Sequence, residues 1–256
     1  MNLIARRFLF IILLFIVKTA FSQESALPLL DEKKILYIKE FSSGLVITNR
    51  GFGINFKIGR QQTGNRKITY NGELAVIKHP QEVRQINPII SSNAKSFAFA
   101  KSNNFLTLRT GIGSDRLLFD RDEKDGVEIQ LIYEAGLSTG LLKPIYYDVQ
   151  NPFNNQEIDV IEEKFDPLKH DQSTIYGPTG FLRGIDETFI IPGAYIKSGI
   201  NFDWSRQSEK IRSLEFGFTF DGYSKKIPII ATINNINVNK QYFLSLYAKI
   251  SIGNRK

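Results

Sequence analysis

The segment Leu214-Glu215-Phe216-Gly217-Phe218-Thr219-Phe220-Asp221 decides the fold of this chain. Large hydrophobic side chains alternate there with charged, small or hydroxyl-bearing ones. A period of two belongs to a β-strand whose two faces meet different surroundings. The alternation returns in segments of roughly ten residues separated by turns, which is the pattern of strands in a membrane-embedded barrel. The sequence therefore predicts an all-β chain with one apolar and one polar face to its sheet.

The N-terminal residues have the three parts of a secretory signal peptide. Arg6-Arg7 form a basic start, residues 8–17 are continuously apolar, and Ala20-Phe21-Ser22 offers small side chains for cleavage before Gln23. The apolar run is shorter than the about 20 residues that a membrane-spanning helix needs. No Cys follows that could carry a lipid anchor. We expect residues 1–22 to be removed after export; the alternative is an uncleaved anchor helix.

Export together with period-two strands predicts an integral outer-membrane β-barrel of a Gram-negative bacterium. No later segment is apolar for long enough to cross a bilayer as a helix, so a membrane-spanning sheet must close on itself to pair its backbone groups. The formal charge of +7 falls to +4 when the leader, with its three basic and no acidic residues, is removed. This mild charge, without a Lys/Arg-rich run or a nucleic-acid motif, is that of an ordinary protein surface, and we expect no nucleic-acid partner.

Eight antiparallel strands are expected, at about 44–50, 53–61, 67–78, 96–113, 127–142, 190–204, 210–222 and 240–253. The connections between them alternate in length, except that the first outer one, at Arg50 to Phe52, is short. Short turns at 62–66, 121–126 and 205–209 suit the periplasmic side, and long loops at 79–95, 143–188 and 223–239 suit the extracellular side. Residues 23–43 are then a periplasmic lead-in, and residues 44–256 are the barrel. Ten strands, and a soluble secreted β-sandwich, are the alternatives.

If the large hydrophobic side chains point outward, charges of both signs enter the barrel. An isolated buried ion is costly, so these side chains are expected to pair. An eight-stranded barrel has an interior just wide enough for side chains to fill, which favours a salt-bridged plug over a small pore. The expected interior network consists of Lys57, Glu73, Arg109, Glu128, Glu134, Lys197, Asp203, Glu215 and Lys249.

The long connections hold the other candidate residues. An aromatic, Asn- and Pro-rich loop is a reasonable recognition surface, and a His at the rim is a conceivable general base. A His needs an orienting group and a nucleophile before it can act, and two His without Cys are a weak metal signal. We therefore expect no catalytic residue, metal or cofactor. The loop residues proposed for recognition are His79, Tyr146, Tyr147, Phe153, His170 and Tyr176.

Several segments resemble a group of small outer-membrane barrels common in Bacteroidetes-type bacteria. They are Thr48-Asn49-Arg50-Gly51-Phe52-Gly53, Lys78-His79-Pro80-Gln81-Glu82, Asn104-Phe105-Leu106-Thr107-Leu108-Arg109, Gly140-Leu141-Leu142-Lys143-Pro144, Lys164-Phe165-Asp166-Pro167-Leu168-Lys169-His170 and Pro192-Gly193-Ala194-Tyr195. Relatives often carry Gly-Trp where this chain has Gly51-Phe52. The chain also ends without the terminal aromatic residue of common barrels. The resemblance implies a fold and a location, and it supplies no catalytic residue.

Three functions follow as hypotheses. The first is a non-enzymatic outer-membrane barrel that is structural or binds a partner or ligand through its loops. The second is an enzyme at the rim that modifies lipid A with His79 or His170 as base, and the third is a small pore. Expected partners are outer-membrane lipid, lipopolysaccharide and other envelope proteins.

Overall fold

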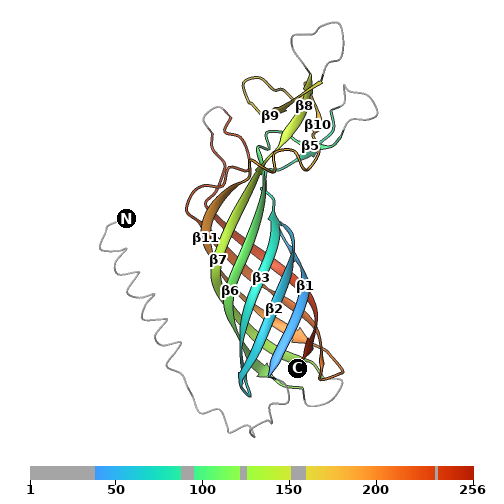
Figure 1. The fold of residues 1–256 in the computed structure, drawn as a ribbon, viewed down its shortest axis with the longest axis vertical. Helices are drawn as coiled ribbons and strands as arrows, with labels where there is room; N and C mark the ends of the chain where they lie inside the picture. Colours follow the sequence, from blue (N-terminus) through green and yellow to red (C-terminus); the bar gives the residue numbers. More distant parts are fainter. Residues whose placement is uncertain (1–37, 88–94, 122–125, 151–159, 234–235) are drawn as a thin grey trace, which may run out of the picture. The chain divides into compact units, whose positions relative to one another are not determined.

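The computed structural model describes residues 38–87, 95–121, 126–150, 160–233 and 236–256. Eight long strands form a closed antiparallel barrel in the order β1-β13-β12-β11-β7-β6-β3-β2 (Figure 1). The predicted all-β, eight-stranded barrel is confirmed, and the ten-strand and sandwich alternatives are wrong. The signal peptide at 1–22 lies outside the described residues, as does the lead-in up to residue 37. The barrel strands are β1 (Lys39–Thr48), β2 (Gly51–Thr63), β3 (Arg66–Ile77), β6 (Asn103–Phe119), β7 (Glu128–Pro144), β11 (Phe189–Asp203), β12 (Lys210–Tyr223) and β13 (Tyr242–Arg255).

Several strands are longer than the sequence predicts at the end where β1 begins. β1 starts at Lys39 instead of residue 44, and β13 continues past residue 253 to Arg255. The physical reason is an ion pair inside the barrel, where Arg255 Nε lies 2.8 Å from Glu40 Oε1. Glu40 and Arg255 occupy inward positions, so the strands continue through them. The apolar residues alone suggested that the alternation had already ended.

β6 is displaced along the sequence from the expected strand at 96–113. It begins at Asn103 and ends at Phe119, while Phe97–Ala98 forms the short strand β5, which pairs with β4 (Arg84–Gln85). Between β5 and β6, Ala100 has a positive φ of 62°, a conformation that non-glycine residues rarely adopt. The chain therefore changes direction there and does not extend as one strand.

The outer wall of the barrel is apolar over most of its length. Outward positions carry exposed large hydrophobic side chains on neighbouring strands, among them Leu45, Phe56, Leu137, Phe218 and Leu246. The intervening inward positions are buried and mostly polar. A monomeric soluble protein rarely exposes a continuous apolar surface of this kind, so the wall requires an apolar environment.

Two tyrosine side chains cross the inside of the barrel at positions where neighbouring strands carry paired glycines. Gly111 is opposite Gly136, and Gly199 is opposite Gly217. A Cβ on Gly111 would lie 2.4 Å from Tyr195 Oη, and one on Gly199 would lie 2.5 Å from the corresponding atom of Tyr247. Glycine is thus required at these inward positions because the aromatic rings fill the space that a side chain would take.

The connection 143–188 contains a small sheet, although the sequence suggests an irregular loop. β8 (Tyr146–Gln150) lies between β10 (Ile175–Pro178) and β9 (Val160–Lys164). This sheet has its own hydrophobic core, and we call the sheet and its core residues the cap. The buried core side chains are Phe97, Ile145, Tyr147, Val149 and Ile175.

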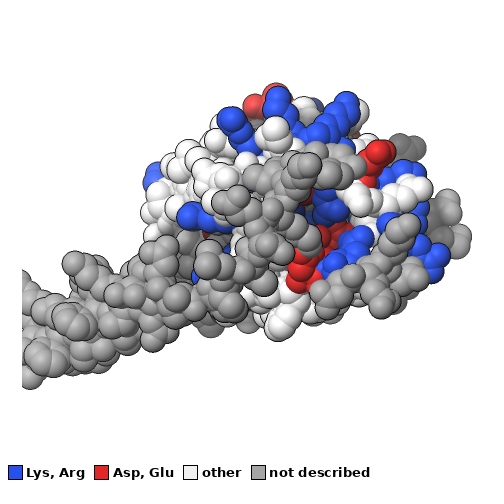
Figure 2. All heavy atoms as spheres, turned by 90° about the horizontal axis from the view of Figure 1, so that it is seen from below, with Lys and Arg blue, Asp and Glu red and all other residues white. Residues whose placement is uncertain are grey.

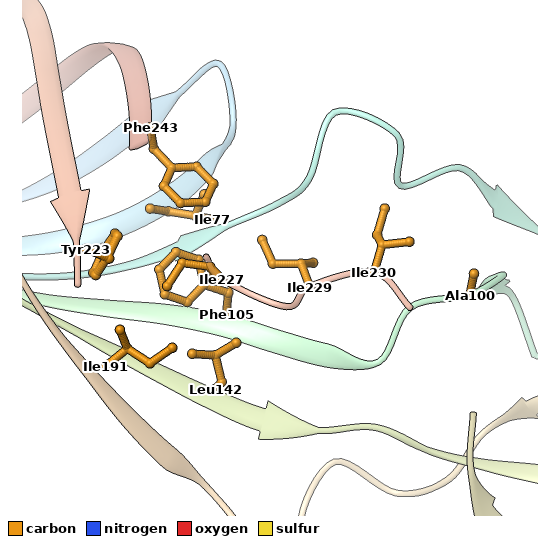
Figure 3. Close-up of a cluster of buried hydrophobic side chains, with 10 residues drawn as sticks. All are labelled: Ile77, Ala100, Phe105, Leu142, Ile191, Tyr223, Ile227, Ile229, Ile230 and Phe243. Atoms are coloured by element: carbon orange, nitrogen blue, oxygen red, sulfur yellow. The ribbon is translucent and has the colours of Figure 1, made fainter. Parts of the chain in front are cut away.

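A second apolar cluster fills the barrel at the end from which β7 continues toward β8. Ile227, Ile229 and Ile230 come from the connection between β12 and β13 and pack against inward side chains at the strand ends (Figure 3). The strand residues of the cluster are Ile77, Phe105, Leu142, Ile191, Tyr223 and Phe243. The cluster closes this mouth of the barrel with hydrocarbon. The described residues include no helix long and apolar enough to span a membrane.

Candidate functional site

The middle of the barrel interior is held together by charge-assisted hydrogen bonds around Arg109. This side chain from β6 binds Asp221 of β12 through two bonds, with Nε–Oδ1 at 2.8 Å and Nη2–Oδ2 at 2.7 Å. Its Nη1 also binds Glu73 of β3, which accepts a further bond from Lys197 of β11. All four side chains are at most 2% exposed. The network therefore ties together four strands that are distant in the sequence.

Further pairs extend the network toward the end of the barrel where β1 begins and β13 ends, which we call the terminal end. Lys249 lies 2.6 Å from Glu215, which also accepts a 2.7 Å hydrogen bond from Tyr247. Lys57 lies 2.6 Å from Asp115. Glu134 accepts a hydrogen bond from the Tyr195 hydroxyl. Each of these inward groups has a complementary partner, as burial of charge requires.

A second ionic cluster occupies the barrel mouth at the terminal end. Arg255 binds Glu40 and also Asp203, the latter at 2.5 Å. Lys67 lies 2.9 Å from Glu40, and Glu128 lies 4.0 Å from Arg255. Figure 2 views this end from below, where acidic and basic side chains meet near the middle. The remaining cavity lined by these residues has a volume of about 30 Å³, room for about two water molecules.

All nine residues expected in the interior lie at inward positions of the barrel. Seven are buried, and the side chains of the other two, Lys57 and Glu128, are 13% and 18% exposed. Their pairing is as described above, and their role as a functional site stays a prediction.

The sequence missed other members of the interior network. Glu40, Asp115 and Arg255 fell beyond the strand ends that the apolar pattern suggested. Lys67 and Asp221 lay within expected strands, so the period of two could have found them. The alternation can be followed outward along each strand until two successive inward positions no longer fit it. Extending the strands in this way would recover the missed interior residues.

His79 follows β3 and is buried beneath the connection between β12 and β13. Its Nδ1 accepts a 3.2 Å hydrogen bond from the Gln81 backbone N–H, and its Nε2 lies 3.3 Å from the Val238 carbonyl oxygen. Burial lowers the pKa of His79 below its ordinary value of 6.5. Both ring nitrogens are thus engaged by the backbone, as in a side chain that fastens two loop segments.

His170 is also buried, in the connection between β9 and β10. Its Nδ1 accepts a 3.0 Å hydrogen bond from the Asp166 backbone N–H, and its Nε2 lies 3.3 Å from Glu163 Oε2. The Ser173 hydroxyl instead lies 3.5 Å from Asp171. Within the described residues, the structure does not join His170, Asp171 and Ser173 into a nucleophile–base arrangement.

The three loop tyrosines have different surroundings, and Phe153 lies outside the described residues. Tyr147 is buried in the cap core, and its hydroxyl shares its one proton between the carbonyl oxygens of Ala98 and Lys101, at 2.9 and 2.8 Å. It is therefore a packing residue and does not contribute to a recognition surface. Tyr176 lies on β10 and is half-buried.

Tyr146 is the loop aromatic residue that two cations approach. Lys164 Nζ lies 5.5 Å and Arg183 Cζ 5.0 Å from the centre of its ring, which are cation–π distances. Its hydroxyl donates a 2.7 Å hydrogen bond to Glu187. Hydrogen bonds from Lys164 and Tyr146 lower the pKa of Glu187.

An open hollow of about 530 Å³ lies beside Tyr146 on the cap. Aromatic, acidic and basic side chains line it together, including those of Tyr146, Glu162, Glu163, Phe165, Asp166 and Lys169. A concave surface that combines aromatic side chains with a few polar groups is a common form of ligand site. The described residues contain no cluster of His, Cys, Asp and Glu suited to a metal ion.

No protein-family model matches this chain, and no curated protein matches it. Among solved structures it is similar to Neisserial surface protein A, at 9% identity and a TM-score of 0.39, over 86% of this chain and 97% of that one. It is also similar to Ail, the attachment invasion locus protein of Yersinia pestis, solved with the heparin analogue sucrose octasulfate, at 8% identity and a TM-score of 0.38 over the same shares. The fold of this chain rests on its own strand pairing.

Proposed function

We propose that this protein is an integral outer-membrane β-barrel that anchors the cap at the cell surface and carries out no chemistry itself. The observation that carries the proposal is the contrast between the two faces of the barrel. Outward side chains such as Leu45, Leu137 and Leu246 are more than 60% exposed, whereas inward ones such as Arg109 and Glu215 are at most 2% exposed. Hydrocarbon outside and paired ions inside is the reverse of a soluble fold, and it suits a bilayer.

The filled interior argues against the alternative of a small pore. Arg109, Tyr195 and Tyr247 cross the middle of the barrel, and the cluster around Phe105 and Ile229 occupies one mouth. The cavity at the other mouth has a volume of only about 30 Å³. An ion could pass only if several ion pairs and a hydrocarbon cluster separated together, so we expect no steady conductance.

The two His rings argue against the alternative of a lipid A-modifying enzyme. Each Nδ1 accepts a backbone hydrogen bond, and each Nε2 faces a carbonyl or carboxylate oxygen. A general base needs a free ring nitrogen aimed at the reacting hydroxyl or water. Both rings are buried where they fasten loop segments, so we propose that neither has a chemical role.

The cap is the part of the molecule best suited to recognition. Its hydrophobic core and its three-stranded sheet hold the hollow beside Tyr146 in a defined shape. Partners proposed for it are lipopolysaccharide and other envelope proteins. We further propose that the chain belongs to the small Bacteroidetes-type barrels that it resembles, with residues 1–22 removed as a signal peptide.

Location and barrel state are tested by expression in a Gram-negative host. The protein should stay in the Sarkosyl-insoluble membrane fraction and migrate differently in gels before and after boiling. Planar-bilayer recordings on the purified protein should stay closed, and lipid A should be unchanged in strains with His79→Ala or His170→Ala. Recovery in the soluble fraction would overturn the proposal, and altered lipid A in either variant would restore the enzyme hypothesis.

Recognition by the cap is tested with a photo-cross-linking amino acid in intact cells. Placed at exposed Lys169 in the hollow, it should give a defined adduct that is reduced by Tyr146→Ala. The matched control position is Lys226, which is exposed in the connection between β12 and β13. The same adducts from both positions, or none from Lys169, would contradict a role for the hollow.

A further inference from the structure

Every charged side chain at an exposed outward position of the eight barrel strands is basic, although the interior carries both signs. These strands are described in full, and their outward positions hold no Asp or Glu. We call the six residues the basic belt. They are Lys39 on β1, Arg60 on β2, Arg66 on β3, Arg116 on β6, and Lys210 and Arg212 on β12.

The basic belt lies at the terminal end of the barrel, where β1 begins and β13 ends. Lys39 begins β1, Arg66 begins β3 and Lys210 begins β12, while Arg60 and Arg116 lie near the ends of β2 and β6. Figure 2 shows this end, with basic side chains spread around its edge. At the opposite end, the outward Lys143 is buried and donates a 2.9 Å hydrogen bond to the Arg183 carbonyl. Exposed positive charge on the wall is therefore confined to one end.

Two pairs of these cations face each other across neighbouring strands. Lys39 is the register partner of Arg60, and Arg66 is the register partner of Arg116. Like charges directly opposite each other destabilise a sheet. None of the six belt residues forms an ion pair with another described residue, whereas the interior cations Arg109 and Lys197 do. An arrangement that repels itself in the isolated chain points to an anion outside the chain.

A hollow on the wall lies beside Lys210 and Arg212. It has a volume of about 370 Å³ and is bordered by Phe41, Ser43, Ile252 and Asn254 as well as by the two cations. The hydrocarbon side chains of Phe41 and Ile252 are more than half exposed. The site thus offers apolar surface, hydrogen-bonding groups and positive charge together, which matches an acyl chain attached to a phosphate.

Trp204 is bonded through its backbone to Arg212, one of the residues that line this hollow. It follows β11, is 44% exposed, and its backbone N–H donates a 3.1 Å hydrogen bond to the Arg212 carbonyl. Tryptophan side chains favour the level of the lipid headgroups. Its position therefore places Lys210 and Arg212 at the same depth as phosphate groups, if the barrel spans a bilayer.

We propose that the basic belt binds the phosphates of anionic phospholipids in the leaflet at the terminal end of the barrel. The inference rests on the proposed membrane location. Guanidinium groups match phosphate oxygens with two parallel hydrogen bonds. A phosphate between Arg66 and Arg116, or between Lys39 and Arg60, converts a repulsive pair into an attractive bridge. The leaflet at the terminal end thus supplies the negative charge that the outer wall lacks.

Trp204 is the single tryptophan of the chain, so it reports on lipid beside the hollow. The protein is folded into mixed vesicles of phosphatidylcholine and phosphatidylglycerol, and one of the two lipids is brominated so that it quenches Trp204 fluorescence on contact. Comparing the quenching by the two brominated lipids measures the preference for phosphatidylglycerol. Each Lys or Arg near a charged membrane surface raises the affinity for anionic over neutral lipid about fivefold. The preference for phosphatidylglycerol should therefore fall roughly twentyfold in Lys210→Gln/Arg212→Gln. The matched control Lys225→Gln/Lys226→Gln removes the same charge from the opposite end and should leave the preference unchanged.

The two pairs of facing cations give a second test. If these cations had only a structural role, the effect of removing them would not depend on the lipid. Arg66→Gln/Arg116→Gln should be at least as stable to urea as the parent protein in phosphatidylcholine, and less stable than the parent in phosphatidylglycerol. Equal quenching by both lipids in the parent protein would overturn lipid binding by the basic belt while leaving the barrel in the membrane. So would an equal fall in lipid preference in Lys210→Gln/Arg212→Gln and in the control variant. Failure of Trp204 to be quenched by any lipid would instead overturn the membrane location.

Discussion

Replacing Arg109 by Met should break the interior network at its centre. The side chain is 2% exposed and makes three charge-assisted hydrogen bonds, two to Asp221 and one to Glu73. Methionine keeps much of the volume and removes the charge. Glu73 retains Lys197 as a partner, but among the described side chains Asp221 retains only the 3.2 Å hydrogen bond from Ser138. The loss should therefore come mainly from the uncompensated Asp221 carboxylate.

The expected cost follows from what remains buried. Removing one partner of a buried ion pair costs about 3–5 kcal/mol because the other charge stays without compensation. Asp221→Asn should cost less, because Arg109 keeps its bond to Glu73 and an amide can still accept one hydrogen bond. In Arg109→Met/Asp221→Asn no lone carboxylate remains, so the double variant should be less destabilised than the sum of the single variants by about 2 kcal/mol or more.

The assay is urea-induced unfolding of the protein from vesicles, followed by Trp204 fluorescence at low and high salt. The coupling energy should be insensitive to salt because the pair is buried. The matched control is Arg183→Met, which removes an exposed pair with Glu162, 56% and 46% exposed, and should cost less than about 1 kcal/mol. A cost below 1 kcal/mol for Arg109→Met, or additive single variants, would refute this reasoning.

Two further predictions concern packing and pH. Gly217→Ala should lower the free energy of unfolding by about 1–3 kcal/mol, because its Cβ would lie 2.1 Å from the Ser198 carbonyl oxygen. The control is Gly72→Ala, because Gly72 has open space around it. Equal urea midpoints for the two variants would contradict the packing. Burial lowers the pKa of His79 below 6.5 in the folded protein, so the unfolded chain binds more protons at this residue. The stability that neutral His79 contributes is complete above pH 6.5 and should be lost as the pH falls through the lower folded pKa. His79→Gln should therefore flatten the decline of the urea midpoint between pH 8 and pH 5, and parallel declines would show that this ring is not the cause.

The barrel could be predicted from the sequence because one rule, the period of two, applies in every strand. Phe216, Phe218 and Phe220 alternate with Glu215 and Thr219, so the faces of β12 follow directly. The strand count followed from the turns between such segments. What failed were strand ends, because Glu40 and Arg255 are polar residues that join the barrel only through each other.

The cap could not be predicted because its strands depend on distant contacts. β9 is only five residues long and consists of two apolar residues followed by three charged ones, so no period-two pattern separated it from a loop. Its core joins Val149 and Ile175 with Phe97, which precedes them by about fifty residues or more in the sequence. The basic belt was likewise invisible, because strand register decides that Arg66 faces Arg116.

The most direct measurement is a cysteine scan of β12, which the cysteine-free chain allows without further change. An environment-sensitive fluorophore is attached in turn at each of residues 214–221, with the protein folded in vesicles containing spin-labelled lipid. Lipid quenching should alternate, strong at Leu214, Phe216, Phe218 and Phe220 and weak at the positions between them. Uniform quenching, or strong quenching by a water-soluble agent at the phenylalanine positions, would contradict a barrel with hydrocarbon outside and paired ions within.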